Sequence, residues 1–106
     1  MDAAAPLPLV TLLPPRLLAA ITGASLRSAQ RWRGGTVPRP ASVARLRETD
    51  AILDLLGSGA STNARRAWLE APNPTLDGER PLDRIARGDL AAVRGAAAGY
   101  GAGDFV

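Results

Sequence analysis

The chain lacks the two residue types on which many catalytic and metal sites depend, because neither cysteine nor histidine occurs among its 106 residues. Their absence excludes disulfides, thiolate nucleophiles, imidazole bases and the usual zinc ligands. The carboxylates of Asp77, Glu79, Asp83 and Asp89 could in principle pair as acid and base, but clustered acids beside turns are far more often caps and solvated residues. We therefore expect a protein that is not an enzyme and that uses no cofactor or metal.

Aromatic residues are also scarce, and Trp32, Trp68, Tyr100 and Phe105 are the only four. A chain of this length buries only about two-thirds of its unfolded surface, and its many alanines add little apolar area. Trp32 and Trp68 lie in line with other apolar residues, so we expect both in the core. The small core favours a homodimer or a larger assembly with a partner.

Long hydrophobic runs are missing too. No stretch of about eighteen apolar residues is present, which excludes a membrane span. The apolar run near the start is interrupted by prolines, and Asp2 stands where a signal peptide carries basic residues. We expect a cytoplasmic protein with no membrane partner.

Charge is divided unevenly along the chain. Residues 1–47 contain seven arginines and one acid, a net charge of +6, whereas residues 48–106 contain six arginines and nine acids, a net charge of −3. A basic front half joined to an acidic rear half suggests two different partners.

A glycine-containing turn separates two short helical patterns between residues 19 and 35, as in a helix-turn-helix that reads DNA. Ser25 is a candidate N-cap for the second helix, whose Leu26, Ala29 and Trp32 recur at helical spacing and are expected to pack inward. The other side chains would face outward and could donate hydrogen bonds to phosphates or base edges: Arg27, Ser28, Gln30, Arg31 and Arg33.

The arginines of the front half divide into two groups. Arg27 and Arg31 lie on adjacent turns of one helix face and are the best candidates for reading bases. We interpret the others as phosphate contacts: Arg33, Arg39, Arg45 and Arg47. Operator DNA is the partner that this pattern favours, and a solvated basic face is the alternative.

The remaining sequence predicts further helices and no β-strand, so we expect an all-α fold. Residues 1–13 form a proline-rich arm, and a supporting helix begins at the prolines 14 and 15 and ends at Gly23. A connecting helix spans residues 41–56, and a short helix ends at Glu70 before an ordered loop at residues 71–81. Pro81 begins the next helix, Asp89 caps the last one, and residues 99–106 end the chain loosely.

The connecting helix carries its charges against the helix dipole, with Arg45 and Arg47 early and Asp50 and Asp54 late. These residues are placed either for partner surfaces, with the arginines toward DNA and the acids toward a second protein, or on a solvated face. The sequence leaves both interpretations open.

The rear half resembles the toxin-binding domain of the Xre, MbcA and ParS antitoxins. The matching residues are Trp68 and Leu69, Asn73 and Pro74, Leu76, Gly78, Pro81 and Leu82, Gly88 and Asp89, and the aromatic tail. The front half, with Gly23, Ser25 and residues 31–35, is similar to the Xre-type helix-turn-helix of the same family, although the first helix is truncated. The family organisation implies an arm at residues 1–13, a DNA-binding region with its connecting helix at 14–56, and a toxin-binding domain with its tail at 57–106.

This resemblance implies an antitoxin whose partner is a RES-domain toxin, an NAD-consuming enzyme related to ADP-ribosyltransferases. The C-terminal segment would block the toxin's active site, and the front half would bind operator DNA to autoregulate the operon. The residues to which the resemblance assigns toxin binding are Trp68, Asn73, Pro74, Arg80, Tyr100, Asp104, Phe105 and Val106. A stand-alone helix-turn-helix transcription regulator with a C-terminal dimerisation domain is the alternative.

Overall fold

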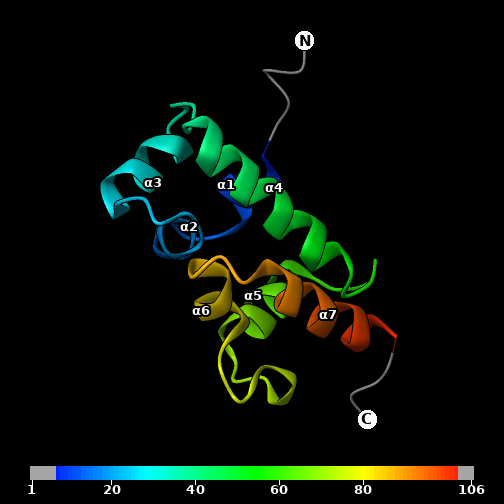
Figure 1. Ribbon diagram of the computed structural model, residues 1–106. Helices are drawn as coiled ribbons and strands as arrows, with labels where there is room; N and C mark the ends of the chain where they lie inside the picture. The colour runs from blue at the N-terminus through cyan, green and yellow to red at the C-terminus, as the bar shows by residue number, and fades with distance from the viewer. Residues whose placement is uncertain (1–6, 103–106) are drawn as a thin grey trace.

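The computed structural model describes residues 7–102, and the chain is helical throughout this range, with no β-strand (Figure 1). The elements follow in the order α1 (Pro8–Leu12), α2 (Pro15–Thr22), α3 (Leu26–Arg33), α4 (Pro40–Asp54), α5 (Thr62–Glu70), the 3-10 helix η2 (Pro74–Leu76), α6 (Pro81–Ala86) and α7 (Leu90–Gly101). The expected all-α fold is confirmed.

Local sequence signals set the ends of α2 and α3. Pro15 occupies the first turn of α2, where its missing N–H costs nothing, and Gly23 ends the helix in the left-handed conformation at a φ of 79°. Ser25 caps α3, since its hydroxyl accepts a hydrogen bond from the Ser28 N–H at 3.0 Å. Ala29 and Trp32 are buried as expected, but the prediction for Leu26 was wrong, because its side chain is 50% exposed at the first turn.

Part of the expected N-terminal arm is helical. Pro8 begins the short helix α1, and a proline at this position is compatible with a first helical turn. Leu9 and Leu13 are almost fully buried against the core. Burial of these leucines, which the proline-rich composition did not indicate, holds the segment in place.

The central helix α4 begins at Pro40 and ends at Asp54, close to the expected bounds. It buries Leu46, Ile52 and Leu53, whereas Val43 is half-buried. Thr49 is fully buried and donates its hydroxyl hydrogen to the Arg45 carbonyl at 2.8 Å, which satisfies the polar group inside the core.

The last helix is longer than the sequence indicated. The loose end expected from residue 99 onward is partly wrong, because α7 continues to Gly101 and buries Ala96 and Ala97. Asp89 stands at the N-cap position of α7 but its side chain makes no capping hydrogen bond; it accepts one from Arg84 instead.

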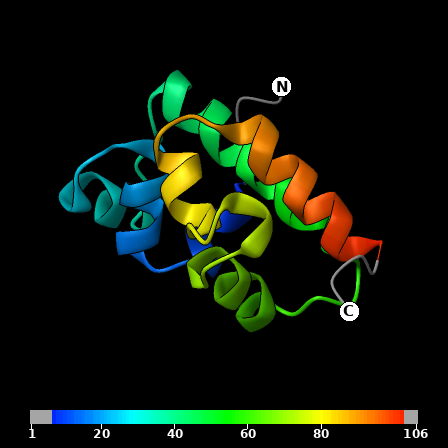
Figure 2. The same cartoon turned by 60° about the horizontal axis from the view of Figure 1, so that its bottom comes forward.

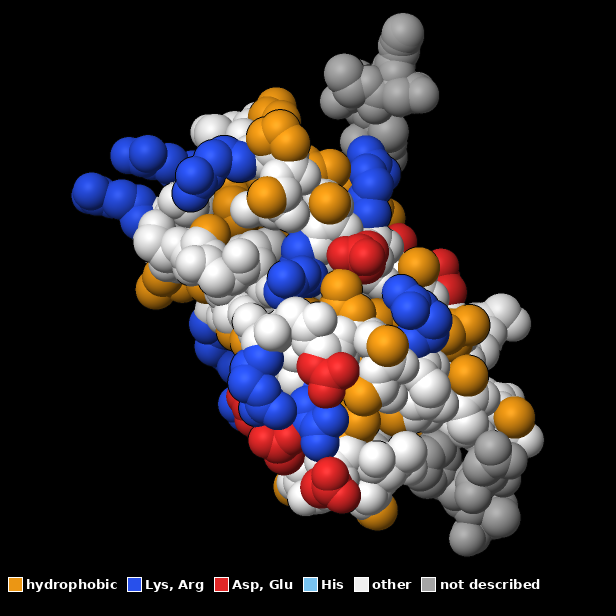
Figure 3. All heavy atoms as spheres, in the orientation of Figure 1, with side chains coloured by type: hydrophobic (Ala, Val, Ile, Leu, Met, Phe, Trp, Pro, Cys, Tyr) orange, Lys and Arg blue, Asp and Glu red, His pale blue; other side chains and the backbone are white. Residues whose placement is uncertain are grey.

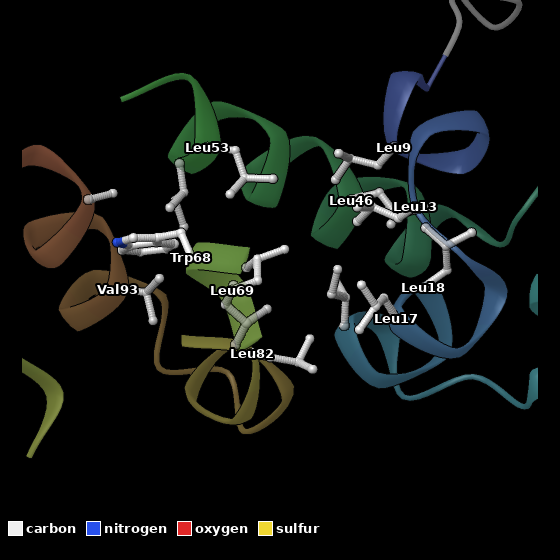
Figure 4. Close-up of a cluster of buried hydrophobic side chains, with 14 of the residues drawn as sticks. Leu9, Leu13, Leu17, Leu18, Leu46, Leu53, Trp68, Leu69, Leu82 and Val93 are labelled. Atoms are coloured by element: carbon white, nitrogen blue, oxygen red, sulfur yellow. The ribbon is translucent and has the colours of Figure 1, made fainter. Parts of the chain in front are cut away.

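One hydrophobic core extends through both halves of the chain. Figure 4 shows Leu17, Leu18 and Leu46 of the front helices on one side and Trp68 and Leu82 of the rear helices on the other. The helices α2 and α6 pack together, and α7 lies along α4, as Figure 2 shows. The regions expected at residues 14–56 and 57–106 are therefore joined by a continuous apolar interior.

Candidate functional site

The outer face of α3 carries most of the side chains predicted to contact DNA. Arg27, Gln30, Arg31 and Arg33 are exposed, and Ser28 is half-buried beside the Ser25 cap. Helix α3 lies at one edge of the molecule, where basic side chains extend into solvent in Figure 3. The helix therefore presents hydrogen-bond donors, as the sequence pattern predicts.

Arg33 differs from its neighbours on α3. Its Nη1 donates a hydrogen bond to the Leu13 carbonyl at 3.4 Å, so the guanidinium lies toward the end of α1. This contact is long and the side chain remains exposed. The guanidinium therefore retains donors for a second partner, and it also connects α3 with the segment that precedes α2.

A pocket of about 180 Å³ lies between α3, the following loop and the start of α4. Arg31 and Trp32 of α3 line it, together with Thr36, Val37 and Arg39 of the loop. The pocket therefore combines two guanidinium groups with a hydroxyl and apolar walls. It brings Arg31 and Arg39 together at one place, although eight positions separate them in sequence.

The structure places Arg45 in a different role from the one that its sequence position suggested. Its Nη1 donates hydrogen bonds to the carbonyl oxygens of Ile21, at 3.1 Å, and Ile85, at 2.7 Å. The guanidinium is thus held inside the molecule, between the C-terminal turns of α2 and α6. Two backbone carbonyls thus hold the half-buried guanidinium, and this placement favours a role within the fold over the predicted phosphate contact.

Arg47 is exposed, but it lies away from the pocket of Arg31 and Arg39. It borders a second pocket, of about 220 Å³, between α1 and α4, which is also lined by Asp50 and Asp54. These acids reduce the positive potential around Arg47. Of the arginines assigned to phosphates, Arg39 is the one that shares a pocket with a candidate base-reading residue.

The two acids of α4 have different surroundings. Asp54 accepts a hydrogen bond from Arg65 at 2.9 Å and is exposed. Burial raises the pKa of Asp50, the nearby charge of Asp54 raises it further, and Arg65 acts in the opposite direction. Asp54 is therefore used partly within the fold, through its ion pair with Arg65, and only the remaining acidic surface is available to a partner.

In the rear half, Trp68 and Asn73 are buried and organise the fold. Trp68 packs in the core, as its line of apolar neighbours indicated. The Asn73 side chain accepts a hydrogen bond from the Thr75 N–H at 2.9 Å, and its carbonyl accepts from the N–H groups of Leu76 and Gly78. Both residues therefore shape the loop and the core of the rear half.

Pro74 and Arg80 lie nearer the surface. Pro74 is exposed at the start of η2. Arg80 makes a two-pronged ion pair with Asp83, at 2.9 and 2.8 Å, and the hydrogen bonds from this arginine lower the pKa of the Asp83 carboxyl. The pair is partly exposed, so both residues remain within reach of a partner.

Arg84 is the functional candidate that the sequence analysis missed. Its guanidinium donates to Glu79, to Asp89 at 2.8 Å, to the Leu76 carbonyl at 3.2 Å and to Asp77 at 3.3 Å. These contacts draw the loop before α6 onto the start of α7. Three of the four clustered acids, which the sequence favoured as caps and solvated residues, are arranged around this arginine, whereas Asp83 pairs with Arg80. The five-residue spacing of Arg84 from both Glu79 and Asp89 was the available signal.

Glu79 is the most strongly perturbed carboxylate of this cluster. Arg87 donates to it at 3.0 and 3.1 Å, and Arg84 donates to it as well. Hydrogen bonds from these two arginines, Arg87 first, lower the pKa of Glu79 from 4.5 to about 2. The carboxylate is therefore charged at every physiological pH, and it stabilises the loop as an ion.

Tyr100 lies on the last turn of α7 and is 46% exposed. The next residue, Gly101, approaches α4 so closely that an added Cβ would lie 2.0 Å from the Leu55 carbonyl oxygen. The last turn of α7 is thus held close to the end of α4. The predicted toxin contacts Asp104, Phe105 and Val106 lie outside the described residues.

Comparisons with known proteins agree with this arrangement. Residues 53–96 match the family of the antitoxin Xre/MbcA/ParS C-terminal toxin-binding domain, a range that covers the end of α4, the Arg84 cluster and most of α7. The chain is also 34% identical over 89 residues to a protein of Mycobacterium tuberculosis (strain ATCC 25618 / H37Rv) named "probable mycobacterial cidal antitoxin", and the match covers 84% of this chain and 76% of that protein. No solved structure matches the chain significantly.

The chain belongs to the Xre/MbcA/ParS antitoxins. Members of this family bind a toxin and are not enzymes, which agrees with the expectation from composition. Within residues 7–102, no helix is long and apolar enough to cross a membrane.

Proposed function

We propose that this antitoxin neutralises a RES-domain toxin, an NAD-consuming enzyme of the ADP-ribosyltransferase type, by placing its C-terminal segment in the toxin's active site. We also propose that the face of α3 binds operator DNA and represses the operon. The observation that carries the proposal is the division of the surface: an exposed arginine face lies on α3, and the matched toxin-binding domain, residues 53–96, lies mainly in the rear half and extends into α7.

The rear half supports a blocking role because it is a rigid base for a short segment. Arg84 connects the loop before α6 to Asp89 at the start of α7, and Gly101 packs against the end of α4. Residues 103–106 follow directly and include Asp104 and Phe105. A short segment with an aromatic ring and negative charge is suited to entering a cleft, and a fixed starting point reduces the entropy lost on docking.

Growth rescue by truncated antitoxins tests the blocking role. Removal of residues 103–106 leaves α7 intact, so the circular dichroism spectrum should stay unchanged while rescue from the co-expressed toxin is lost. Removal of residues 3–6 is the matched control and should leave rescue intact. Full rescue by the chain without residues 103–106 would contradict the proposed block.

The front half supports DNA binding through Arg27, Gln30 and Arg31, which are exposed on one short helix. Arg39 adds a cation at the shared pocket, where a backbone phosphate could be held. We leave Arg45 out of this surface because its guanidinium serves the carbonyls of Ile21 and Ile85.

Salt dependence tests the DNA interface. The affinity for the operon's own promoter should fall with a logarithmic slope of about −0.9 for each phosphate contacted. Arg39→Ala should reduce this slope by about one, whereas Arg66→Ala, in the rear half, should leave it unchanged. An affinity independent of salt would contradict the interface.

Both proposed partners imply a cytoplasmic protein. The family match favours the antitoxin over a stand-alone regulator whose rear half only dimerises. The neighbouring reading frame distinguishes the antitoxin from the stand-alone regulator, because only an antitoxin should have a RES protein encoded beside it. Co-purification of this chain with the neighbouring gene product tests the same point. The expected homodimer or larger assembly with the toxin stays a prediction, which light scattering of the chain alone and with the toxin would test.

A further inference from the structure

Val37 is the most exposed large apolar side chain of the described residues, at 76%. A single exposed apolar residue is common and needs no explanation by itself. Val37, however, lines the same pocket as Arg31 and Arg39, the two guanidinium groups that the proposed DNA interface brings together. It therefore lies within a surface that also carries charged and polar donors.

The surroundings of Val37 are suited to a small apolar group. Ala24 and Trp32 contribute apolar wall to the pocket, and the Trp32 side chain is otherwise buried. The 5-methyl group of thymine is the apolar mark by which a protein distinguishes bases in the major groove, and side chains recognise it by apolar contact. The two methyl groups of valine can make such a contact, which neither arginine can supply.

We infer that Val37 is a specificity-determining residue that contacts the 5-methyl group of a thymine next to the base read by Arg31. This inference rests on the proposed DNA binding of α3. The contact removes about one methyl group from water, so it favours thymine over a base without the methyl by roughly fourfold. Because the contact carries no charge, it adds sequence preference without changing the salt dependence.

The test compares thymine with deoxyuridine, which differs only by the 5-methyl group. A duplex is first selected from a random pool with the full-length chain, and each thymine is then replaced singly by deoxyuridine. The wild-type chain should lose roughly fourfold in affinity at one position. Val37→Ala should bind the thymine and deoxyuridine duplexes equally at that position, with an unchanged salt slope.

Leu12→Ala is the matched control, since Leu12 is another exposed apolar side chain and does not line the pocket. It should retain the wild-type preference for thymine. Val37→Ala is expected to fold, because its side chain is mostly in solvent, and its circular dichroism spectrum should match that of the wild type.

Two results would overturn the inference while leaving DNA binding intact. In the first, the wild-type chain binds all deoxyuridine duplexes as it binds thymine. In the second, Val37→Ala weakens binding to every sequence equally, which would indicate that Val37 contacts the sugar of the DNA backbone and not a base. By contrast, a wild-type chain that shows no salt-sensitive binding to any duplex would defeat the proposed DNA binding itself and this inference with it.

Discussion

Replacement of Arg45 by methionine should destabilise the whole protein, because this side chain connects its two halves. The Nη1 group donates to the Ile21 carbonyl at 3.1 Å and to the Ile85 carbonyl at 2.7 Å. Both carbonyls lie near the C-terminal ends of their helices, where some backbone oxygens lack helical partners and where a positive charge is favourable. Methionine has a similar length but no donor and no charge.

The expected loss follows from the two hydrogen bonds. Each hydrogen bond from a charged donor contributes about 1.5–3 kcal/mol, and the lower value applies here because the side chain is only half-buried. Arg45→Met should therefore lower the free energy of unfolding by about 3 kcal/mol. For a domain of this size, such a loss corresponds to a decrease in Tm of roughly 12–24 °C.

Urea and thermal unfolding, followed by circular dichroism at 222 nm, measure this loss. Arg47→Met is the matched control, since Arg47 lies two residues further along the same helix and is exposed; it should change the free energy of unfolding by less than about 0.5 kcal/mol. If the two variants unfold at the same urea concentration, the bridging role of Arg45 is refuted.

Two further perturbations address the rear half. Because the pKa of Glu79 is lowered from 4.5 to about 2, its stabilising contribution is complete above pH 4.5 and is lost as the pH falls toward 2. Glu79→Gln should therefore be less stable than the wild type at pH 6, and its Tm should depend less on pH between 4.5 and 2. Glu48→Gln is the control, and an equal change in its Tm profile would argue against Glu79 as the source of the pH dependence. Gly101→Ala should destabilise the protein by about 1–3 kcal/mol, since the new Cβ would meet the Leu55 carbonyl oxygen at 2.0 Å. Gly95→Ala, in open space on the same helix, should instead stabilise it by up to about 1 kcal/mol in the same urea titration, and equal effects of the two would contradict the packing.

Most of the helices were predictable from the sequence because their ends carry strong local signals. Pro15, Ser25 and Pro81 start helices, and Gly23 ends one, through backbone preferences that do not depend on the rest of the fold. The burial of Trp32 and Trp68 also followed from helical spacing alone.

The features that could not be predicted from the sequence depend on how the helices pack against one another. Leu26 has the spacing of a core residue, yet its side chain at the first turn of α3 is half exposed to solvent. The glycine-rich segment from residue 99 onward predicts a frayed end, but packing of Ala96 and Ala97 against the core extends α7 to Gly101.

The candidate site was predictable only in part for the same reason. An arginine pattern indicates a basic face but cannot show which guanidinium groups the fold itself uses. Arg27 and Arg31 are exposed as expected, whereas Arg45 is used internally by carbonyls 24 and 40 positions away in sequence. Arg84 was missed because a spacing of five residues from Glu79 and from Asp89 does not itself show that the loop before α6 and the start of α7 meet at one guanidinium.

The interior shared by α2 and α6 limits how such antitoxins can be recombined. A chimaera that joined the front half of one paralogue to the rear half of another would have to match two complementary surfaces, together with an arginine at the junction. Exchange of partner specificity between paralogues should therefore proceed by substitutions on the outer faces. Exchange of whole halves should yield unstable proteins unless the buried interface between α2 and α6 is transferred with them.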